Sequence, residues 1–300
     1  MRVLITGATG LVGSHLSNLC REKGISVNYL TTSKNKIQKQ VDYRGFFWDP
    51  EKGEIDRESL RDIDAIIHLA GASVAKRWTE SYKKEILDSR IKSAALLYSA
   101  VQDSGFSVPQ FISASGISVY PSSLQKFYTE DEQAVDDTFL GEVVVRWEAA
   151  ADEFEDLDMK VSKIRTGLVL AEEGGALPKM KIPAKYNAGA AFGSGKQWQS
   201  WIHINDLSGI YLYVLQNKLE GVYNAVAPNP VTNEELMEKI AEQLEKSQWL
   251  PNIPSGVLKF ALGEMSNAVL ASQLVSAEKI QKKGYTFQYS NLPKALEDLL

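Results

Sequence analysis

Three glycines near the start of the chain have the spacing of a phosphate-binding turn. Gly7, Gly10 and Gly13 follow an apolar run at residues 3–5 and precede a helical pattern at residues 11–19. Such a turn presents backbone N–H groups and the positive end of a helix to an anion. Glycine permits the turn, the approach of a pyrophosphate and close helix–strand packing. The pattern predicts a dinucleotide site rather than an ordinary glycine-rich turn. The candidate contacts are Gly7, Thr9, Gly10, Leu11, Val12 and Gly13.

The loop after the second predicted strand indicates which dinucleotide binds. Residues 25–30 form that strand, and the chain continues with Thr32, Ser33 and Lys34 and without an acidic residue. An acid there would accept a hydrogen bond from the ribose 2′-hydroxyl and favour NAD, whereas hydroxyls and a cation suit a 2′-phosphate. We expect NADP(H), and less strongly NAD(H). The alternative is a solvated basic loop.

The elements that position these groups alternate between strand and helix. Further strands are expected at residues 46–48, 65–71, 111–115, 161–166 and 222–226, and helices at 79–102 and 140–157. This alternation predicts an α/β, Rossmann-like, doubly wound parallel sheet. We expect His68, inside an all-apolar strand, to pack rather than react. The candidate cofactor contacts at the carboxyl ends of strands are Leu69, Ala70, Gly71, Ser113, Arg165 and Gly167.

Beyond Gly167 the pattern becomes rich in loops and then helical. Asp206 is expected to cap a helix at residues 207–216, and Thr232 with Glu235 has the spacing of a capping box. We assign residues 1–168, with 200–226 returning to them, to an NAD(P)-binding domain. Residues 169–199 and 227–300 are assigned to a small, mostly helical C-terminal domain.

Composition narrows the class of protein. The chain has 300 residues, of which 44% are hydrophobic, and a net charge of −5, which argues against nucleic acid or an anionic membrane as partner. No apolar run is long enough for a membrane span, and the chain begins directly in a strand, without the pattern of a signal peptide. The single cysteine, Cys20, excludes an internal disulfide, and the three scattered histidines suggest no metal site. We expect a cytoplasmic protein with a small polar substrate, and a homodimer is one option for its assembly.

Several stretches resemble a known family. They include GATGLVGSHL, HLAG, KRWTE, DSRI, SASGISVY, RWEAAA, RTGLVL and GSGKQWQSWIHINDL. The chain resembles the extended short-chain dehydrogenases/reductases, and more narrowly their atypical nucleoside-diphosphate-sugar epimerase-like branch. The resemblance implies an NAD(P)-binding Rossmann domain with a small C-terminal domain over the substrate cleft. It implies no particular substrate.

The resemblance fails at the residues that usually react. Typical members use a Ser or Thr, a Tyr and a Lys, and the Tyr acts as acid or base because neighbouring cations lower its pKa. Here Val143 stands at the Tyr position and Trp147 at the Lys position, and neither transfers a proton. Ser115 or Ser118 could replace the hydroxyl donor, and Tyr120 could supply a phenol. Other candidates are Arg146 or Arg165 for an anionic substrate, Arg77 and Arg90 on the substrate side, and Trp78, Trp198 and Trp201 at the pocket mouth.

Two functions follow from this pattern. The first is an NADP(H)-dependent oxidoreductase or epimerase, with Ser115 and Tyr120 as candidate contacts of the substrate oxygen. For both residues the competing interpretation is structural: a hydroxyl bonded within the protein for Ser115, and packing for Tyr120. The second function is a catalytically degenerate NADP(H)-binding sensor or scaffold module.

Overall fold

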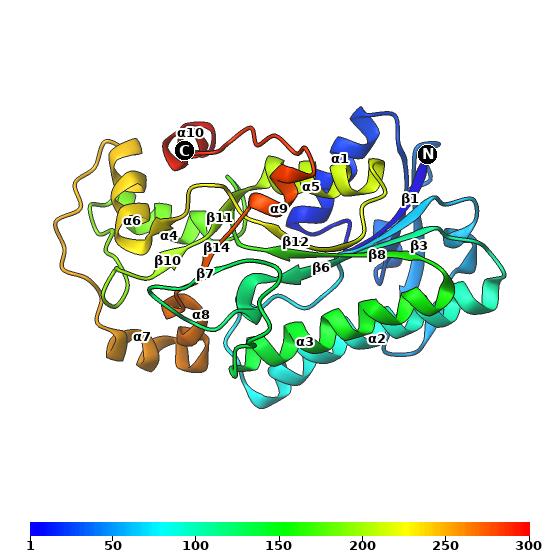
Figure 1. Ribbon diagram of the computed structural model, residues 1–300, viewed down its shortest axis with the longest axis horizontal. Coiled ribbons are helices and arrows are strands. Elements are labelled where there is room, and N and C mark those ends of the chain that lie inside the picture. Colours follow the sequence, from blue (N-terminus) through cyan, green and yellow to red (C-terminus); the bar gives the residue numbers. More distant parts are fainter.

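A twisted eight-stranded sheet runs through the protein (Figure 1). The computed structural model describes all residues from 1 to 300. The strand order is β12-β8-β6-β5-β1-β2-β3-β4, and every neighbouring pair is parallel except β3 with β4. The predicted α/β doubly wound sheet is therefore confirmed. The strands are β1 Arg2–Thr6, β2 Ser26–Thr31, β3 Tyr43–Asp49, β4 Glu54–Ile55, β5 Ala65–His68, β6 Gln110–Gly116, β8 Lys160–Thr166 and β12 Gly221–Ala225.

Helices cover both faces of this sheet (Figure 1). Helices α1, Leu11–Glu22, and α5, Ile204–Gln216, pack together on one face, while α2, Glu80–Ser104, and α3, Phe139–Asp152, pack on the other. Successive strand residues alternate between the two resulting cores. Within β1, Val3 and Ile5 join the α1–α5 core, whereas Leu4 joins the α2–α3 core. Strands buried on both faces explain the continuous apolar runs in the sequence.

A hydroxyl side chain caps α2, whereas the residue that caps α5 is not the one that the sequence predicts. The side chain of Thr79 accepts a hydrogen bond from the Tyr82 N–H at the start of α2. Helix α5 begins at Ile204, and its cap is His203, whose Nδ1 accepts from the Asn205 N–H. The prediction that Asp206 caps this helix is therefore wrong.

Asp206 instead attaches a late segment of the chain to α5. Its fully buried carboxylate accepts hydrogen bonds from the Tyr285 hydroxyl and from the backbone N–H groups of Gln288 and Tyr289. Three donors from a distant segment satisfy an acid that local sequence suggests is a cap. Spacing along one helix cannot reveal such partners.

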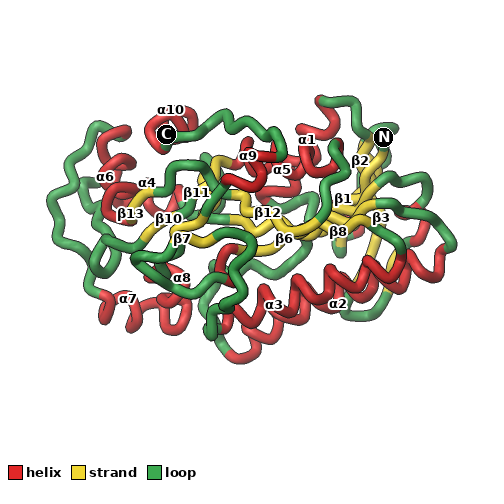
Figure 2. Tube along the Cα trace, in the orientation of Figure 1, coloured by secondary structure: helices red, strands yellow, loops and turns green.

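The C-terminal half builds a further core beside the sheet. It contains α4, Leu177–Lys185, α6, Asn233–Gln243, and α10, Leu292–Leu299. The predicted cap at Thr232 is confirmed, because its side chain accepts from the Glu235 N–H. Figure 2 shows that a long loop leads into α10. The remaining elements are β7 Phe127–Tyr128, β9 Leu168–Leu170, β10 Trp198–Gln199, β11 Trp201–His203, β13 Val231–Thr232, α7 Ser255–Leu262, α8 Ser266–Leu270, β14 Leu274–Val275 and α9 Glu278–Lys282. None of the helices combines the length and the apolar character that crossing a bilayer requires.

Candidate active site

The glycine turn joins β1 to α1 in a form that only glycine accommodates. Gly7 adopts φ +68°, and a Cβ there would lie 2.9 Å from the backbone of Leu69. A Cβ on Gly13 would lie 2.2 Å from the Gly7 carbonyl oxygen. No side chain caps α1 at Gly10, so the first N–H groups of this 12-residue helix remain available to an anion. Thr9 and Gly10 are exposed, and Leu11 and Val12 are half-buried.

The neighbouring loop is held against this turn by β1 and β5. The Thr6 hydroxyl accepts hydrogen bonds from the backbone N–H groups of Leu69 and Ala70, each at 3.1 Å, and lies 2.8 Å from Nδ1 of His68. The other ring nitrogen of His68 lies 3.2 Å from the Ser93 hydroxyl. His68 is fully buried, which confirms that it packs, and burial lowers its pKa to about 4.

The loop after β2 carries the three polar residues that are expected to bind a 2′-phosphate. Thr32 and Lys34 are exposed and Ser33 is half-buried, with its N–H donating to the Thr31 hydroxyl. The ammonium of Lys34 lies 4.9 Å from the ring centroid of Phe47. Lys34 forms no ion pair, so its charge is available to a ligand.

A pocket of about 280 Å³ lies beyond the carboxyl end of β6. Ser115 and Gly167 line it, together with the apolar side chains of Val143, Val144 and Trp147 on α3. The pocket thus combines strand-end residues of the sheet with the helix that usually carries the reactive Tyr and Lys. Helix α8 also contributes a lining residue, Ala268.

Ser115 belongs to a buried ionic network behind this pocket. Its hydroxyl donates a 2.5 Å hydrogen bond to Oε1 of Glu148, and Glu148 accepts two 2.8 Å hydrogen bonds from the guanidinium of Arg165. Arg165 in turn donates to the Tyr120 hydroxyl at 2.9 Å, and this hydroxyl donates to Oδ1 of Asn224 at 2.8 Å. The network therefore runs from the pocket wall to β12.

The predicted site residues divide between the pocket and this network. The structure brings Ser115, Ser118 and Gly167 to the pocket, but it does not bring Tyr120 there. Tyr120 is 1% exposed and its hydroxyl is paired on both sides, which matches the packing interpretation. The Arg165 guanidinium is likewise occupied by Glu148 and Tyr120. Ser113 is buried, and its hydroxyl donates to the Ala114 carbonyl.

Two donors in the pocket wall have no partner. Arg90 and Trp147 both line the pocket, and the guanidinium of Arg90 lies 4.6 Å from the Trp147 ring centroid. Nε of Arg90 and Nε1 of Trp147 are buried atoms without a hydrogen bond. Another nitrogen of the Arg90 guanidinium, Nη1, donates to the carbonyls of Ile86 and Ala72 at 2.8 Å and 3.2 Å.

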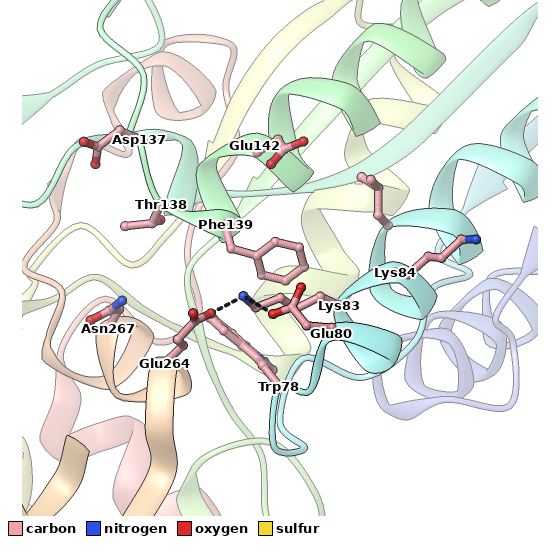
Figure 3. A pocket seen from close by; sticks show the side chains of 11 residues that line it. Trp78, Glu80, Lys83, Lys84, Asp137, Thr138, Phe139, Glu142, Glu264 and Asn267 are labelled. Carbon is pink, nitrogen blue, oxygen red and sulfur yellow. Dashed lines mark hydrogen bonds and ion pairs between the residues drawn. The ribbon is translucent and has the colours of Figure 1, made fainter. Parts of the chain in front are cut away.

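A charged outer cavity of about 700 Å³ adjoins this region (Figure 3). The Lys83 ammonium, on α2, forms ion pairs with Glu80 on the same helix and with Glu264 of the C-terminal region. Trp78 and Phe139 flank this lysine (Figure 3). A third cavity of about 310 Å³ shares Trp78 with the outer cavity. It shares Leu140 with the 280 Å³ pocket beyond β6, the inner pocket of this region, so the three cavities adjoin.

Sequence reasoning missed Glu148 and left the placement of the predicted tryptophans open. The only signal for Glu148 was a single acid in the otherwise apolar and basic helix stretch VVVRWEAAA. Trp78 and Trp198 line the cavities, whereas Trp201 is fully buried in the C-terminal core. Arg77 is exposed, and Arg146 is paired with Glu142 on the surface.

Comparisons with known proteins agree with this architecture. A family model described as the NAD dependent epimerase/dehydratase family matches residues 3–143, and a domain of unknown function, DUF1731, matches residues 253–299. The epimerase family protein SAR0825 of Staphylococcus aureus strain MRSA252 is 38% identical over 304 residues, covering 99% of this chain and 98% of the relative. The epimerase family protein SH2119 of Staphylococcus haemolyticus is 38% identical over 301 residues with the same coverage.

Two solved structures are similar over the whole chain. The human epimerase family protein SDR39U1, crystallised with NADPH, is 30% identical with a TM-score of 0.87, covering 100% of this chain and 99% of the human chain. The nucleoside-diphosphate sugar epimerase of Corynebacterium glutamicum is 31% identical with a TM-score of 0.79, and the match covers 58% of that longer chain. The predicted family resemblance is thus confirmed. This chain belongs to the epimerase family, with an NAD-dependent epimerase/dehydratase region followed by a DUF1731 region.

Proposed function

We propose that this protein is an NADP(H)-dependent, epimerase-like oxidoreductase that acts on a small polar substrate. The observation that carries the proposal is the glycine turn at the switch point of the sheet, where β1 lies between β2 and β5. Ligands of doubly wound sheets bind at this point, outside the carboxyl ends of the strands. The NADPH complex of the human relative supports the same cofactor class.

The residues around the turn fit a dinucleotide with a 2′-phosphate. The uncapped start of α1 offers backbone N–H groups to the pyrophosphate, and Gly10 leaves room for its approach. Thr32, Ser33 and Lys34 offer two hydroxyls and a cation to the 2′-phosphate. The backbone of residues 69–71, held by Thr6, lies against Gly7 and borders the same site.

Ser115 and Glu148 supply the proton chemistry in this proposal. When bound, the nicotinamide ring exchanges a hydride at C4 with the substrate carbon. The Ser115 hydroxyl donates to Glu148, so its oxygen is free to accept a hydrogen bond from a substrate hydroxyl. The proton then passes through Ser115 to the Glu148 carboxylate during oxidation, and returns by the same route during reduction. Arg165 positions Glu148 through its two hydrogen bonds.

Tyr120 has an indirect role in this scheme. Its phenol donates to Asn224 and accepts from Arg165, and burial raises its pKa above the ordinary value of 10.0. A phenol in this setting stays protonated at neutral pH and holds Arg165 in place. We therefore propose Tyr120 as a positioning residue of the network, and Ser115 as the group that contacts substrate.

Cofactor titration tests the proposal directly. NADPH and NADH are titrated into the purified protein, and binding is followed by the fluorescence of the reduced nicotinamide. The proposal predicts saturable binding with a clear preference for NADPH. Equal affinities, or no binding of either compound, would contradict it.

The sensor or scaffold function rests on one specific observation. Val143 and Trp147, at the positions of the usual Tyr and Lys, both form the pocket wall and cannot exchange protons. A protein of this kind would bind NADPH without consuming it. Incubation with a panel of aldehydes and ketones distinguishes the two functions, because any catalytic loss of NADPH absorbance excludes the sensor.

A further inference from the structure

The inner pocket carries a single charge that no acidic residue neutralises. Arg90 is 8% exposed and is the one charged residue among those that line the pocket. It takes part in no ion pair, although it remains protonated at neutral pH because its pKa falls only to about 10 on burial. A buried, unpaired cation costs free energy, and proteins retain one mainly where a ligand supplies the opposite charge.

The second buried guanidinium of this region provides an internal comparison. Arg165, which is also 8% exposed, is fully paired: Glu148 accepts from both Nε and Nη2. In Arg90, Nη1 donates to two backbone carbonyls, whereas Nε and Nη2 donate to nothing. This is the edge of a guanidinium that binds the two oxygens of a carboxylate. The edge that pairs with Glu148 in Arg165 is therefore without a partner in Arg90.

Trp147 adds an independent donor at the same place. Its indole N–H is buried without a partner, and its ring lies against the Arg90 guanidinium. Two unpaired donors on residues of one pocket wall require an acceptor, because buried polar groups without partners are rare. The other lining residues that α3 contributes, Leu140, Val143 and Val144, are apolar.

We propose that Arg90 and Trp147 bind the carboxylate of a small monocarboxylic acid with an apolar body, and that such acids are the substrate class of this pocket. A single positive charge matches a monoanion better than a pyrophosphate, which is doubly charged. The pocket volume of about 280 Å³ also suits a small acid. As a statement about substrate, the inference rests on the proposed function. It assigns Ser115 to the reacting oxygen and Arg90 to the other end of the substrate.

Benzoate and its neutral analogue benzamide provide the test, because they share the ring and differ in the charged group. Calorimetric titrations at constant ionic strength compare the native protein with Arg90→Met and Trp147→Phe, and with Arg146→Met as a surface control. We expect the native protein to bind benzoate at least about tenfold more tightly than benzamide, and Arg90→Met to lose this preference. Trp147→Phe should weaken benzoate several-fold, and Arg146→Met should leave it unchanged.

Stability and cofactor binding separate this role from a structural one. If Arg90 is retained for ligand binding, the melting temperature of Arg90→Met should be equal to or above that of the native protein. A marked decrease would show that Arg90 has a structural role, binding the carbonyls of Ile86 and Ala72, and would overturn the proposal. So would equal binding of benzoate and benzamide, or no saturable benzoate binding.

The NADPH affinity of Arg90→Met should equal that of the native protein. A loss of NADPH affinity with benzoate binding retained would assign Arg90 to the cofactor instead and overturn the inference. Selective benzoate binding by a native protein that does not bind NADPH would refute the proposed function alone.

Discussion

The hydroxyl of Ser115 donates a 2.5 Å hydrogen bond to Glu148, a residue on the helix that carries neither the usual Tyr nor the usual Lys of the family. Glu148 is also paired with Arg165, so one carboxylate joins the pocket wall to the buried network. Under the proposed function, this relationship supplies the proton acceptor that Val143 and Trp147 cannot provide. Substitutions of Ser115, Glu148 and Arg165 should therefore have different effects on activity and stability.

Replacing Ser115 with Ala should remove the proton path and leave the cofactor site intact. We expect the rate of NADPH oxidation by a carbonyl substrate to fall roughly 100-fold or more, the usual effect of losing acid–base assistance. The Kd for NADPH should not change. Ser118→Ala is the matched control, because Ser118 lines the same pocket without contacting Glu148. A larger loss in Ser118→Ala than in Ser115→Ala would transfer the role to Ser118.

Replacing Lys34 with Ala should weaken NADPH binding selectively. Losing a charge-assisted contact of about 1.5 kcal/mol corresponds to roughly tenfold in Kd. NADH has no 2′-phosphate, so its Kd should stay the same. Lys23→Ala, an exposed lysine at the opposite end of α1, serves as control in the same fluorescence titration. If Lys34→Ala binds NADPH like the native protein, the phosphate assignment is wrong.

Gly13→Ala should disrupt the turn because the added Cβ would lie 2.2 Å from the Gly7 carbonyl oxygen. We expect a loss of about 1–3 kcal/mol in the free energy of unfolding, together with weaker NADPH binding. Gly256→Ala is the control: it lies in helix α7 with no atom near the added Cβ, so it should raise stability by about 0.5–1 kcal/mol. Urea unfolding measures both changes.

Breaking the Glu148–Arg165 pair should be costly, since both side chains are largely buried. Glu148→Gln leaves the Arg165 charge without its partner, and we expect about 3–5 kcal/mol of destabilisation in urea unfolding. The double variant Glu148→Leu/Arg165→Met should recover much of this loss, because it removes both charges. The exposed pair on the same helix is the control: Glu142→Gln should change stability by less than about 1 kcal/mol. Similar losses for Glu148→Gln and Glu142→Gln would contradict the assignment.

Burial of His68 should make stability fall in mild acid. Its pKa is about 4 in the folded protein, against an ordinary value of 6.5. Between these values the unfolded chain binds a proton that the folded chain does not, so stability is lost as pH decreases through this range, by at most about 3 kcal/mol.

The variant His68→Asn isolates this contribution of His68. The difference in unfolding free energy between native and variant should be largest near pH 7 and should shrink toward pH 4. His15→Asn, at an exposed position, should follow the native pH dependence. A native–variant difference that stays constant from pH 7 to pH 4 would show that His68 is not responsible.

The parts of the fold that depend on local sequence could be predicted well. The glycine turn, the apolar strands, the Thr232 cap and the packing of His68 depend on neighbouring residues, on continuous apolar runs or on helical spacing. The absence of an acid after β2 is also readable directly from the chain. Such features follow from backbone conformation and from burial on both faces of a parallel sheet.

The partners of polar side chains were decided only by tertiary structure. Asp206 has the local signature of a helix cap, yet its donors come from residues 79 to 83 positions later in the chain. The hydroxyl of Tyr120 is bonded to Arg165, 45 residues later in the chain, and to Asn224. Tyr120 therefore lies away from the pocket. A hydroxyl, carboxylate or guanidinium takes whichever partner the fold brings within about 3 Å, and sequence spacing does not encode that distance.

The two buried arginines, Arg90 and Arg165, also differ because the fold decides which partners lie within reach of each guanidinium. In the sequence, Arg90 and Arg165 are both candidate site residues, and nothing local shows which of them is paired. In the folded chain, α3 places Glu148 against Arg165 and Trp147 against Arg90, so one guanidinium is neutralised and the other has no acidic partner. Sequence alone predicted the dinucleotide-binding turn, and the packing of α3 against the sheet decided which of the two guanidinium groups is left unpaired.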